Sequence, residues 1–277
     1  MNELGFIKDL FQRNRICYSS FPDKETAEHF IDDLFNFLFA SYEGKYNSEE
    51  KLAKQYADLK NTCSAILFEL LRDEKVVKYH TAEFFDQLPG IYQQLLKDAD
   101  AILKFDPAAQ SIEEVLAAYP GFYATTIYRI AHQLHTQEIK VLPRLFSEYA
   151  HSKTGIDIHP GAEIGASFFI DHGTGIVIGE TTIIGDSVKI YQGVTLGALN
   201  VAKALASSKR HPTIEDSVII YSGATILGGE TVIGHDSIIG GNVWLTYRVP
   251  SYSLVYHKSE IKVRDNNPLS EALNFVI

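Results

Sequence analysis

Cysteine, methionine, tryptophan and long apolar runs are scarce in this chain of 277 residues. It has only two cysteines, Cys17 and Cys63, with one methionine and one tryptophan. The cysteines lack CxxC spacing, so we expect two reduced core residues rather than a zinc or redox motif. No run of about 18 apolar residues is present, which argues against a membrane-spanning helix. The opening MNELGFIKDLFQRNR lacks the apolar core of a secretory signal. Together these absences predict a soluble cytoplasmic protein.

Basic residues are also in the minority. Lys and Arg number 25 against 35 Asp and Glu, which gives a formal net charge of −10. Because no long basic run offsets this charge, nucleic acid is not expected as the main partner. Hydrophobic residues make up 45% of the chain. This composition is typical of a folded globular protein with a substantial core.

The first half of the chain has the pattern of helices. Ser48, followed by Glu49 and Glu50, is a plausible N-cap with acidic residues in the first turn. After it, apolar residues recur at steps of three and four, as on one face of a helix: Leu52, Tyr56, Leu59, Cys63, Ile66, Leu67 and Leu70. Further helices are expected over about 24–42, 80–104, 111–118, 121–136 and 138–150. Pro89-Gly90 and Asp106-Pro107 are expected breaks.

In the second half an aliphatic residue returns at every sixth position. The first run is Ile158, Ile164, Ile170, Ile176, Val188 and Val194, with Thr182 breaking it. The second run is Ile214, Ile220, Ile226, Val232 and Ile238, with Trp244 next. A period of six indicates a parallel β-helix, in which three hexads make one triangular coil. A second series, two places on, runs through Ile178, Ile184, Ile190 and Leu196, and Ile233 and Ile239 suggest a slip of one residue. The inward phase therefore stays open.

The segment between the two runs, about 199–212, breaks the six-residue phase. An insertion that leaves a rigid coil is a common place for function. The stretch Leu227–Gly234 is also one residue longer than expected. The fold class predicted from these patterns is α+β, with an N-terminal all-helical domain over 1–152. A parallel β-helix over 153–260 and a short C-terminal tail over 261–277 follow it.

Two polar residues of the β-helix have the character of an acid–base pair. Asp157 and His172 are 15 residues apart, nearly one coil, so we expect them to meet at one corner. A carboxylate beside an imidazole fixes its tautomer and tunes it as a general base near neutral pH. A single histidine in a β-helix is more often structural, so the interpretation depends on the whole set of motifs.

As a set, the motifs resemble those of the serine O-acetyltransferases, a family of hexapeptide-repeat acyltransferases. They are Asp157-Ile158-His159-Pro160, Ile170-Asp171-His172-Gly173-Thr174-Gly175-Ile176, Gly179-Glu180-Thr181, Val194-Thr195-Leu196-Gly197 and Arg210-His211-Pro212. The resemblance runs from about Asp106 to Val263 and implies a left-handed β-helix after a helical domain. It also implies transfer of the acetyl group of acetyl-CoA to L-serine, giving O-acetyl-L-serine and CoA in the first step of cysteine biosynthesis.

The resemblance also implies roles for the reacting groups. His172 matches the family's general base, and Asp157 matches the carboxylate paired with it. No cysteine lies in the β-helix, so we expect direct attack in a ternary complex without an acyl-enzyme.

Four further residues match groups that bind serine. Asp171 matches an acid that faces the ammonium group, and Asp106 matches the substrate-binding acid that the helical domain contributes. Arg210 and His211 match the pair that grips the carboxylate, a task that suits the guanidinium fork. Read without the resemblance, Asp106 before Pro107 is a simple helix N-cap.

The resemblance implies acetyl-CoA as co-substrate, with no permanently bound cofactor and no metal. The pantetheine arm is expected along Ala198, Ser222, Gly223 and Gly241. Cationic candidates for its phosphates are Lys203, Lys209, Arg210, Lys258, Lys262 and Arg264. The family's habits further imply a homotrimer or a dimer of trimers, and a contact of the C-terminal Ile277 with O-acetylserine sulfhydrylase.

Three other functions stay open at this point. Another hexapeptide acetyltransferase, acting on homoserine or a sugar, would keep His172 without needing Asp106, Arg210 and His211. A metal-dependent β-helix of the carbonic anhydrase type would need three imidazoles at one subunit interface. The candidates for them are His159, His172, His211 and His235. A noncatalytic regulatory subunit would act only through its tail.

Overall fold

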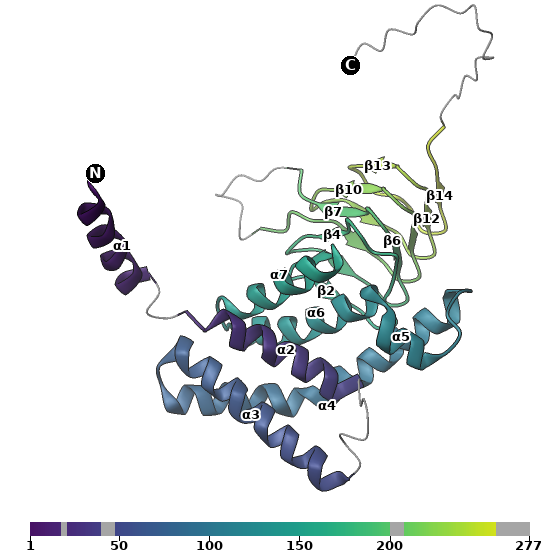
Figure 1. Cartoon of the computed structure of the whole chain (residues 1–277). Coiled ribbons are helices and arrows are strands. Elements are labelled where there is room, and N and C mark those ends of the chain that lie inside the picture. Colours follow the sequence, from purple (N-terminus) through teal and green to yellow (C-terminus); the bar gives the residue numbers. More distant parts are fainter. Residues whose placement is uncertain (18–20, 40–47, 200–207, 259–277) are drawn as a thin grey trace, which may run out of the picture.

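The computed structural model describes residues 1–17, 21–39, 48–199 and 208–258. Within these ranges, helices come first and a parallel β-helix follows (Figure 1). The helices are α1 (Glu3–Cys17), α2 (Lys24–Phe39), α3 (Glu49–Leu71), α4 (Glu74–Phe105), α5 (Ile112–Ala118), α6 (Pro120–Thr136) and α7 (Leu142–Thr154). Figure 1 shows α2–α7 gathered at one end of the β-helix, with α1 projecting from the body. In the described part of the chain no helix is long and apolar enough to cross a membrane.

The helix predictions hold for α3 and are wrong at one proline. Ser48 caps α3, its hydroxyl accepting the Lys51 amide at 3.3 Å. The break expected at Pro89-Gly90 does not occur, because both residues lie inside α4. Proline removes the amide that would bond to the carbonyl of Phe85 four residues earlier. The Tyr56 hydroxyl donates to that carbonyl at 3.3 Å instead, so a contact from α3 compensates for the lost bond.

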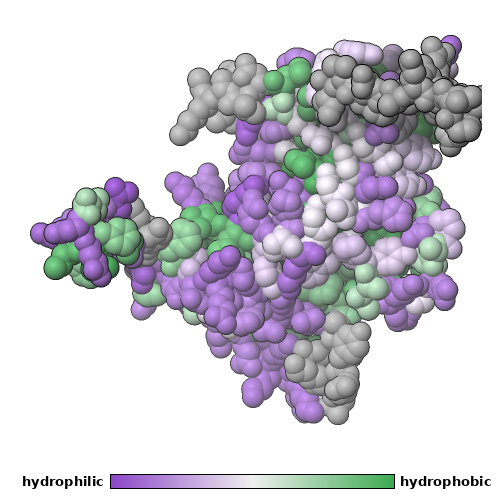
Figure 2. Space-filling view, turned by 45° about the horizontal axis from the view of Figure 1, so that its top comes forward, coloured by the Kyte–Doolittle hydropathy of each residue, from purple (hydrophilic) through white to green (hydrophobic). Residues whose placement is uncertain are grey.

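Helix α1 was not expected as a separate element, and much of its apolar surface is exposed. Leu4, Phe6, Ile7 and Phe11 are each more than half exposed. Figure 2 shows these apolar side chains on the projecting helix at the left, whereas hydrophilic ones cover most of the helical half in that view. Isolated helices of this length are marginal in water, and the sequence pattern gave no buried face with which to predict it.

The β-helix is built from three parallel sheets. Its strands are β1 (Asp157–Ile158), β2 (Glu163–Ile164), β3 (Phe169–Asp171), β4 (Val177–Ile178), β5 (Ile183–Ile184), β6 (Lys189–Tyr191), β7 (Thr195–Gly197), β8 (Thr213–Ile214), β9 (Ile219–Ile220), β10 (Thr225–Leu227), β11 (Val232–Ile233), β12 (Ile238–Ile239), β13 (Trp244–Leu245) and β14 (Leu254–Val255). Sheet A has the order β1-β4-β7-β10-β13, sheet B β11-β8-β5-β2 and sheet C β14-β12-β9-β6-β3. The chain visits A, B and C in turn, so each coil has an A–B, a B–C and a C–A corner.

The strand register resolves the inward phase. Ile158 pairs with Ile178, 20 residues later, because the turn that holds His172 adds two residues to an 18-residue coil. Beyond the long insertion, Ile214 pairs with Ile233, 19 residues later. Each irregular turn shifts the phase of the strands that follow.

Three sequence expectations are corrected or refined by these shifts. The two six-step series before the insertion are both buried, and Thr182, which breaks one of them, is fully buried as well. After Leu227 the slip of one residue is confirmed. Trp244 is accordingly 66% exposed, and Leu245 takes the inward place at 1% exposure. The six-step run was therefore wrong from Val232 onward, where Ile233 and Ile239 are the fully buried residues.

A buried ion pair joins the helical half to the B–C corner. Arg129 of α6 donates to both carboxylate oxygens of Asp98 of α4, at 2.6 and 2.9 Å. The same guanidinium donates to the carbonyls of Ile164 and Gly165, and Asp98 accepts the Phe168 amide. Since these side chains are at most 5% exposed, the helices are fixed against the first coil.

The helical core contains one of the two cysteines. Cys63 is 1% exposed, and burial raises the pKa of its thiol to about 12. It is an unreactive core residue, as expected. Cys17 ends α1.

Candidate active site

The C–A corner of the first coil carries the predicted base. Strand β3 ends at Asp171, and His172 then takes a left-handed conformation with φ 57°. The side chain of His172 is 71% exposed, and its Nδ1 lies 3.7 Å from Oδ1 of Asp171. The two residues added to this turn therefore present an imidazole to solvent instead of continuing the coil.

Asp157 lies at the same end of sheet A as His172. The turn that holds His172 is stacked on the start of β1, because the Gly175 amide donates to the Gly155 carbonyl at 2.8 Å. The Asp157 carboxylate lies 3.9 Å from Arg144. Among the described residues no hydrogen bond or ion pair joins Asp157 to His172. The structure thus brings the two to one corner, while their pairing stays a prediction.

Asp106 reaches this corner from the helical half. It caps the C-terminus of α4, and its Oδ2 accepts a hydrogen bond from the Tyr119 hydroxyl at 2.6 Å. Burial, the Asp106 hydrogen bond and the charges of Asp106 and Asp171 raise the pKa of Tyr119. Burial, the neighbouring Tyr221 and both carboxylates likewise raise the pKa of Tyr191. Two acids 65 residues apart in sequence therefore share one neighbourhood.

Arg210 and His211 lie at the A–B corner, at the other end of sheet A. Backbone amides of both residues donate to the Thr181 hydroxyl, at 2.9 and 3.1 Å. Nδ1 of His211 accepts the Thr181 amide at 3.0 Å, which assigns the remaining proton to Nε2. The Arg210 guanidinium donates to Glu180. A Cβ at Gly179 would overlap the His211 ring, so only glycine admits this packing.

The buried imidazoles of this corner are neutral at pH 7. Burial, with the nearby Arg210 charge, lowers the pKa of His211 to about 4. Burial lowers the pKa of His159 to about 4 as well, against an opposing effect of Glu180. For Glu180 itself, burial is the largest single effect and raises the pKa, but the Arg210 hydrogen bond and the neighbouring positive charges together outweigh it and the pKa falls. The corner thus combines an ionised Arg–Glu pair with neutral imidazoles.

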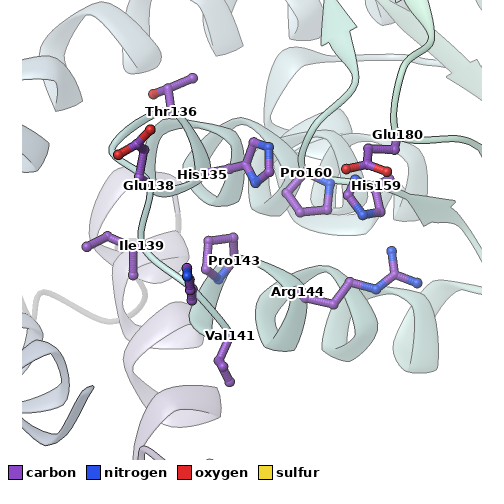
Figure 3. Close-up of a pocket in the computed structure, with 11 residues that line it drawn as sticks. His135, Thr136, Glu138, Ile139, Val141, Pro143, Arg144, His159, Pro160 and Glu180 are labelled. Carbon is purple, nitrogen blue, oxygen red and sulfur yellow. The ribbon is translucent and has the colours of Figure 1, made fainter. Parts of the chain in front are cut away.

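A cavity of about 890 Å³ opens beside this corner. Its lining includes His135, Arg144, His159 and Glu180. In Figure 3 the Glu180 carboxylate lies next to the His159 ring, with Arg144 facing them from α7 and His135 from α6. In the described part of the chain, no three His, Cys, Asp or Glu side chains form a group able to hold a metal ion.

The residues predicted to line the CoA path are also divided between the C–A and the A–B corner. Ser222, Gly223 and Gly241 lie on the C–A corner, in turns stacked above that of His172. Ala198 lies at the A–B corner, directly after β7. Lys209 is exposed, and its ammonium donates to the carbonyls of Thr181, His211 and Pro212. Lys258 is exposed, and the predictions for Lys203, Lys262, Arg264 and Ile277 fall outside the described residues.

Known proteins similar to this chain are serine acetyltransferases. A solved structure of serine acetyltransferase isoform 3 from Entamoeba histolytica, in complex with cysteine, matches with a TM-score of 0.78 and 32% identity, covering 87% of this chain and 84% of that one. This chain belongs to the serine acetyltransferase family.

Two further relatives agree with that assignment. The plasmid serine acetyltransferase of Synechococcus elongatus is 51% identical over 201 residues, 69% of this chain, and the chain spans 62% of the length of that relative. A solved serine acetyltransferase in complex with CoA has a TM-score of 0.57 at 27% identity, covering 83% of this chain and 94% of that one. No family model matches the chain. The architecture is consistent with the left-handed β-helix that the resemblance implied.

Sequence reasoning missed several residues that shape the site. Tyr119 had no assigned role, and Glu180 and Thr181 were quoted only as part of a motif. The sequence does contain a signal for Glu180 and Thr181. Both are polar and directly follow a corner glycine, where the turn itself does not need polar side chains, so a role in the site could have been inferred. Tyr119 has none, since its partner Asp106 is 13 residues away across a helix of the fold.

Proposed function

We propose that this chain is a serine O-acetyltransferase that transfers acetyl from acetyl-CoA to the hydroxyl of L-serine. The proposal depends on one observation: a chain of the serine acetyltransferase family places acidic, basic and imidazole side chains at two neighbouring corners of its β-helix. Two acids lie with an exposed imidazole at one corner, and a guanidinium with a neutral imidazole lies at the next. A serine zwitterion needs groups of both kinds together with a base.

In the proposed reaction His172 acts as general base. Its imidazole takes the proton of the serine hydroxyl as the oxygen attacks the thioester carbonyl. The tetrahedral intermediate then collapses, the C–S bond breaks, and the imidazolium returns a proton to the CoA sulfur. Asp157 stabilises the imidazolium. Such base assistance contributes on the order of 10²–10⁴ in rate, and no acyl-enzyme is formed.

The remaining residues hold the substrate. Asp106 and Asp171 pair with the serine ammonium group. Arg210 and the Nε2 proton of His211 bind its carboxylate, and Glu180 holds the guanidinium in place. Because His211 is neutral at pH 7, it contributes a hydrogen bond rather than a charge.

Within one chain the two groups of residues lie at opposite ends of sheet A, with β4 between His172 and Glu180. We therefore propose that each active site forms between two subunits of a trimer. The C–A corner of one subunit faces the A–B corner of the next, as in a closed ring of heterologous contacts. The CoA path then runs between Gly223 and Gly241 on one side and Ala198 of the neighbouring subunit on the other.

Other sequence expectations stay proposals. They are the division into residues 1–152, 153–260 and 261–277, the pairing of trimers through the helical domain, the contact of Ile277 with O-acetylserine sulfhydrylase, and a cytoplasmic location. Acetyl-CoA as co-substrate without a permanently bound cofactor belongs with them.

The test is an assay of CoA release from acetyl-CoA by the purified protein. We expect release with L-serine and little with homoserine or a galactoside. Release that prefers homoserine or the sugar would assign the chain to a different acceptor. Absence of turnover with all three would contradict an enzymatic role.

A further inference from the structure

The carboxylate of Asp106 is held by two contacts from the helical half. Oδ1 accepts the Ala108 amide at 2.8 Å, and Oδ2 accepts the Tyr119 hydroxyl at 2.6 Å. An ionised carboxylate has about four acceptor positions. Two acceptor positions of the carboxylate are therefore left for a ligand, and the hydrogen bond from Tyr119 sets the orientation of the carboxylate and so the direction of these positions.

The backbone of Tyr119 is itself fixed from both sides. Its amide donates to the Val115 carbonyl and closes α5, while its carbonyl accepts the Tyr123 amide in the first turn of α6. Pro120 follows and restricts the dihedrals of Tyr119 to the extended region, where they are found at φ −83° and ψ 114°. The residue is thus a rigid joint between two helices.

This joint lies against the strand that carries Asp171. A Cβ at Gly121 would overlap the Ile170 carbonyl oxygen, so the start of α6 packs directly on β3. Tyr119 is therefore hydrogen-bonded to Asp106 on the loop, and the helix that begins directly after it packs on the strand that ends at Asp171. Burial, the Asp106 hydrogen bond and the charges of Asp106, Glu114 and Asp171 raise the pKa of Tyr119, so the phenol remains a hydrogen-bond donor.

We propose that Tyr119 is a positioning residue for the ammonium group of L-serine, because its hydroxyl orients the Asp106 carboxylate next to the strand that carries Asp171. Tyr119 contacts neither the thioester nor the base in this account. The inference rests on the proposed function. It assigns to Tyr119 the enzyme's preference for an acceptor that carries an ammonium group.

The test compares Tyr119→Phe with a matched control. In Tyr123→Phe a tyrosine hydrogen bond of similar length is lost, from the hydroxyl to Asp32 at 2.7 Å, a carboxylate with no role in the proposed site. For Tyr119→Phe we expect the KM for L-serine to rise about tenfold, the scale of one hydrogen bond to a charged group. Its kcat and its KM for acetyl-CoA should stay within about twofold of wild type. Tyr123→Phe should change none of the three.

A second acceptor isolates the ammonium group. 3-Hydroxypropionate is L-serine without its amino group, so Tyr119→Phe should leave its kcat/KM unchanged and narrow the preference for serine by the same factor of about ten. Equal losses on both acceptors, a fall in kcat with KM unchanged, or values matching Tyr123→Phe would each overturn the inference.

Two measurements distinguish a failure of this inference from a failure of the proposed function and from a loss of stability. If the wild-type protein does not acetylate serine, the proposed function fails first, whatever Tyr119 does. If Tyr119→Phe melts well below Tyr123→Phe, binding of L-serine and of CoA is measured by calorimetry below the transition. Weaker serine binding with unchanged CoA binding supports the inference, and parallel losses refute it.

Discussion

The two ends of sheet A handle their imidazoles in opposite ways. His172 at the C–A corner is 71% exposed and stands in a turn lengthened by two residues. His211 at the A–B corner is 8% exposed and fixed by Thr181, with its pKa lowered by burial to about 4. An exposed imidazole can exchange protons, whereas a buried neutral one can only donate or accept a hydrogen bond. In the proposed function this difference separates the reacting group, His172, from the binding group, His211, before any substrate is present.

The B–C corner shows a third use of the same architecture. It carries no predicted reacting group, and there the helical half is anchored by Arg129 and Asp98. In the proposed function the three corners of the triangular coil therefore have three tasks: chemistry, substrate binding and attachment of the helical half. The predictions below remove one contribution at a time, from the largest expected effect to the smallest.

The largest effect is expected at the base. His172→Ala should lower kcat by about 10²–10⁴ with an unchanged melting temperature, because the side chain is exposed. Stopped assays of CoA release measure it. The matched control is His235→Ala at the B–C corner, where Nδ1 lies 2.8 Å from Asp236, and it should keep wild-type turnover. Near-normal turnover of the His172→Ala variant would show that His172 is not the general base.

The anchor should control stability rather than chemistry. Arg129→Leu leaves the Asp98 carboxylate buried and unpaired, which costs about 3–5 kcal/mol in the free energy of unfolding. Urea denaturation measures this loss. Arg13→Leu removes an exposed pair with Asp9 and should cost less than about 1 kcal/mol. Similar values for the two variants would refute the anchoring role.

Substitution at the A–B corner should act on substrate binding. Arg210→Lys keeps the charge but loses the planar fork, so we expect the KM for L-serine to rise about 10- to 100-fold. The KM for acetyl-CoA and the melting temperature should change little. Steady-state kinetics with each substrate varied in turn decide the point. A rise confined to acetyl-CoA would move Arg210 to the CoA site.

The smallest effect is in the pH dependence of stability. The pKa of His211 lies near 4 in the folded chain and near 6.5 when unfolded, so between these values the unfolded chain binds more protons. Stability should therefore fall as the pH drops from about 6.5 to 4. His211→Asn keeps an acceptor for Thr181 but cannot titrate, so its melting temperature should fall less steeply over this range. A slope for His211→Asn equal to that of the wild type would contradict the burial argument.

The sequence predicted the architecture because its signals are local. A six-residue period has one structural solution, and the Ser48 cap is read from adjacent residues. The inward phase after each irregular turn was not predictable, since the lengths of the turns at His172 and Leu227 are set by the register of distant strands. The continuation of α4 through Pro89 likewise depends on Tyr56, which lies 33 positions earlier.

The sequence predicted which residues belong to the candidate site, but not how they are arranged in space. Motif order named Asp106, Asp171, His172, Arg210 and His211 without showing that they divide between two corners. That division follows from the direction of the coil, because Arg210 returns beside Glu180 only after the inserted loop. The role of Tyr119 depends on packing between α6 and β3, and no spacing in the sequence encodes it.

The central claim is that each active site takes its base from one subunit and its carboxylate-binding pair from the next. The most direct measurement mixes two variants, His172→Ala and Arg210→Ala, each expected to have little activity. After dissociation and reassembly as a one-to-one mixture of trimers, about one quarter of the sites should combine an intact His172 with an intact Arg210. Recovery of about a quarter of wild-type activity is the predicted result. A reassembled mixture no more active than the separate variants would contradict the account.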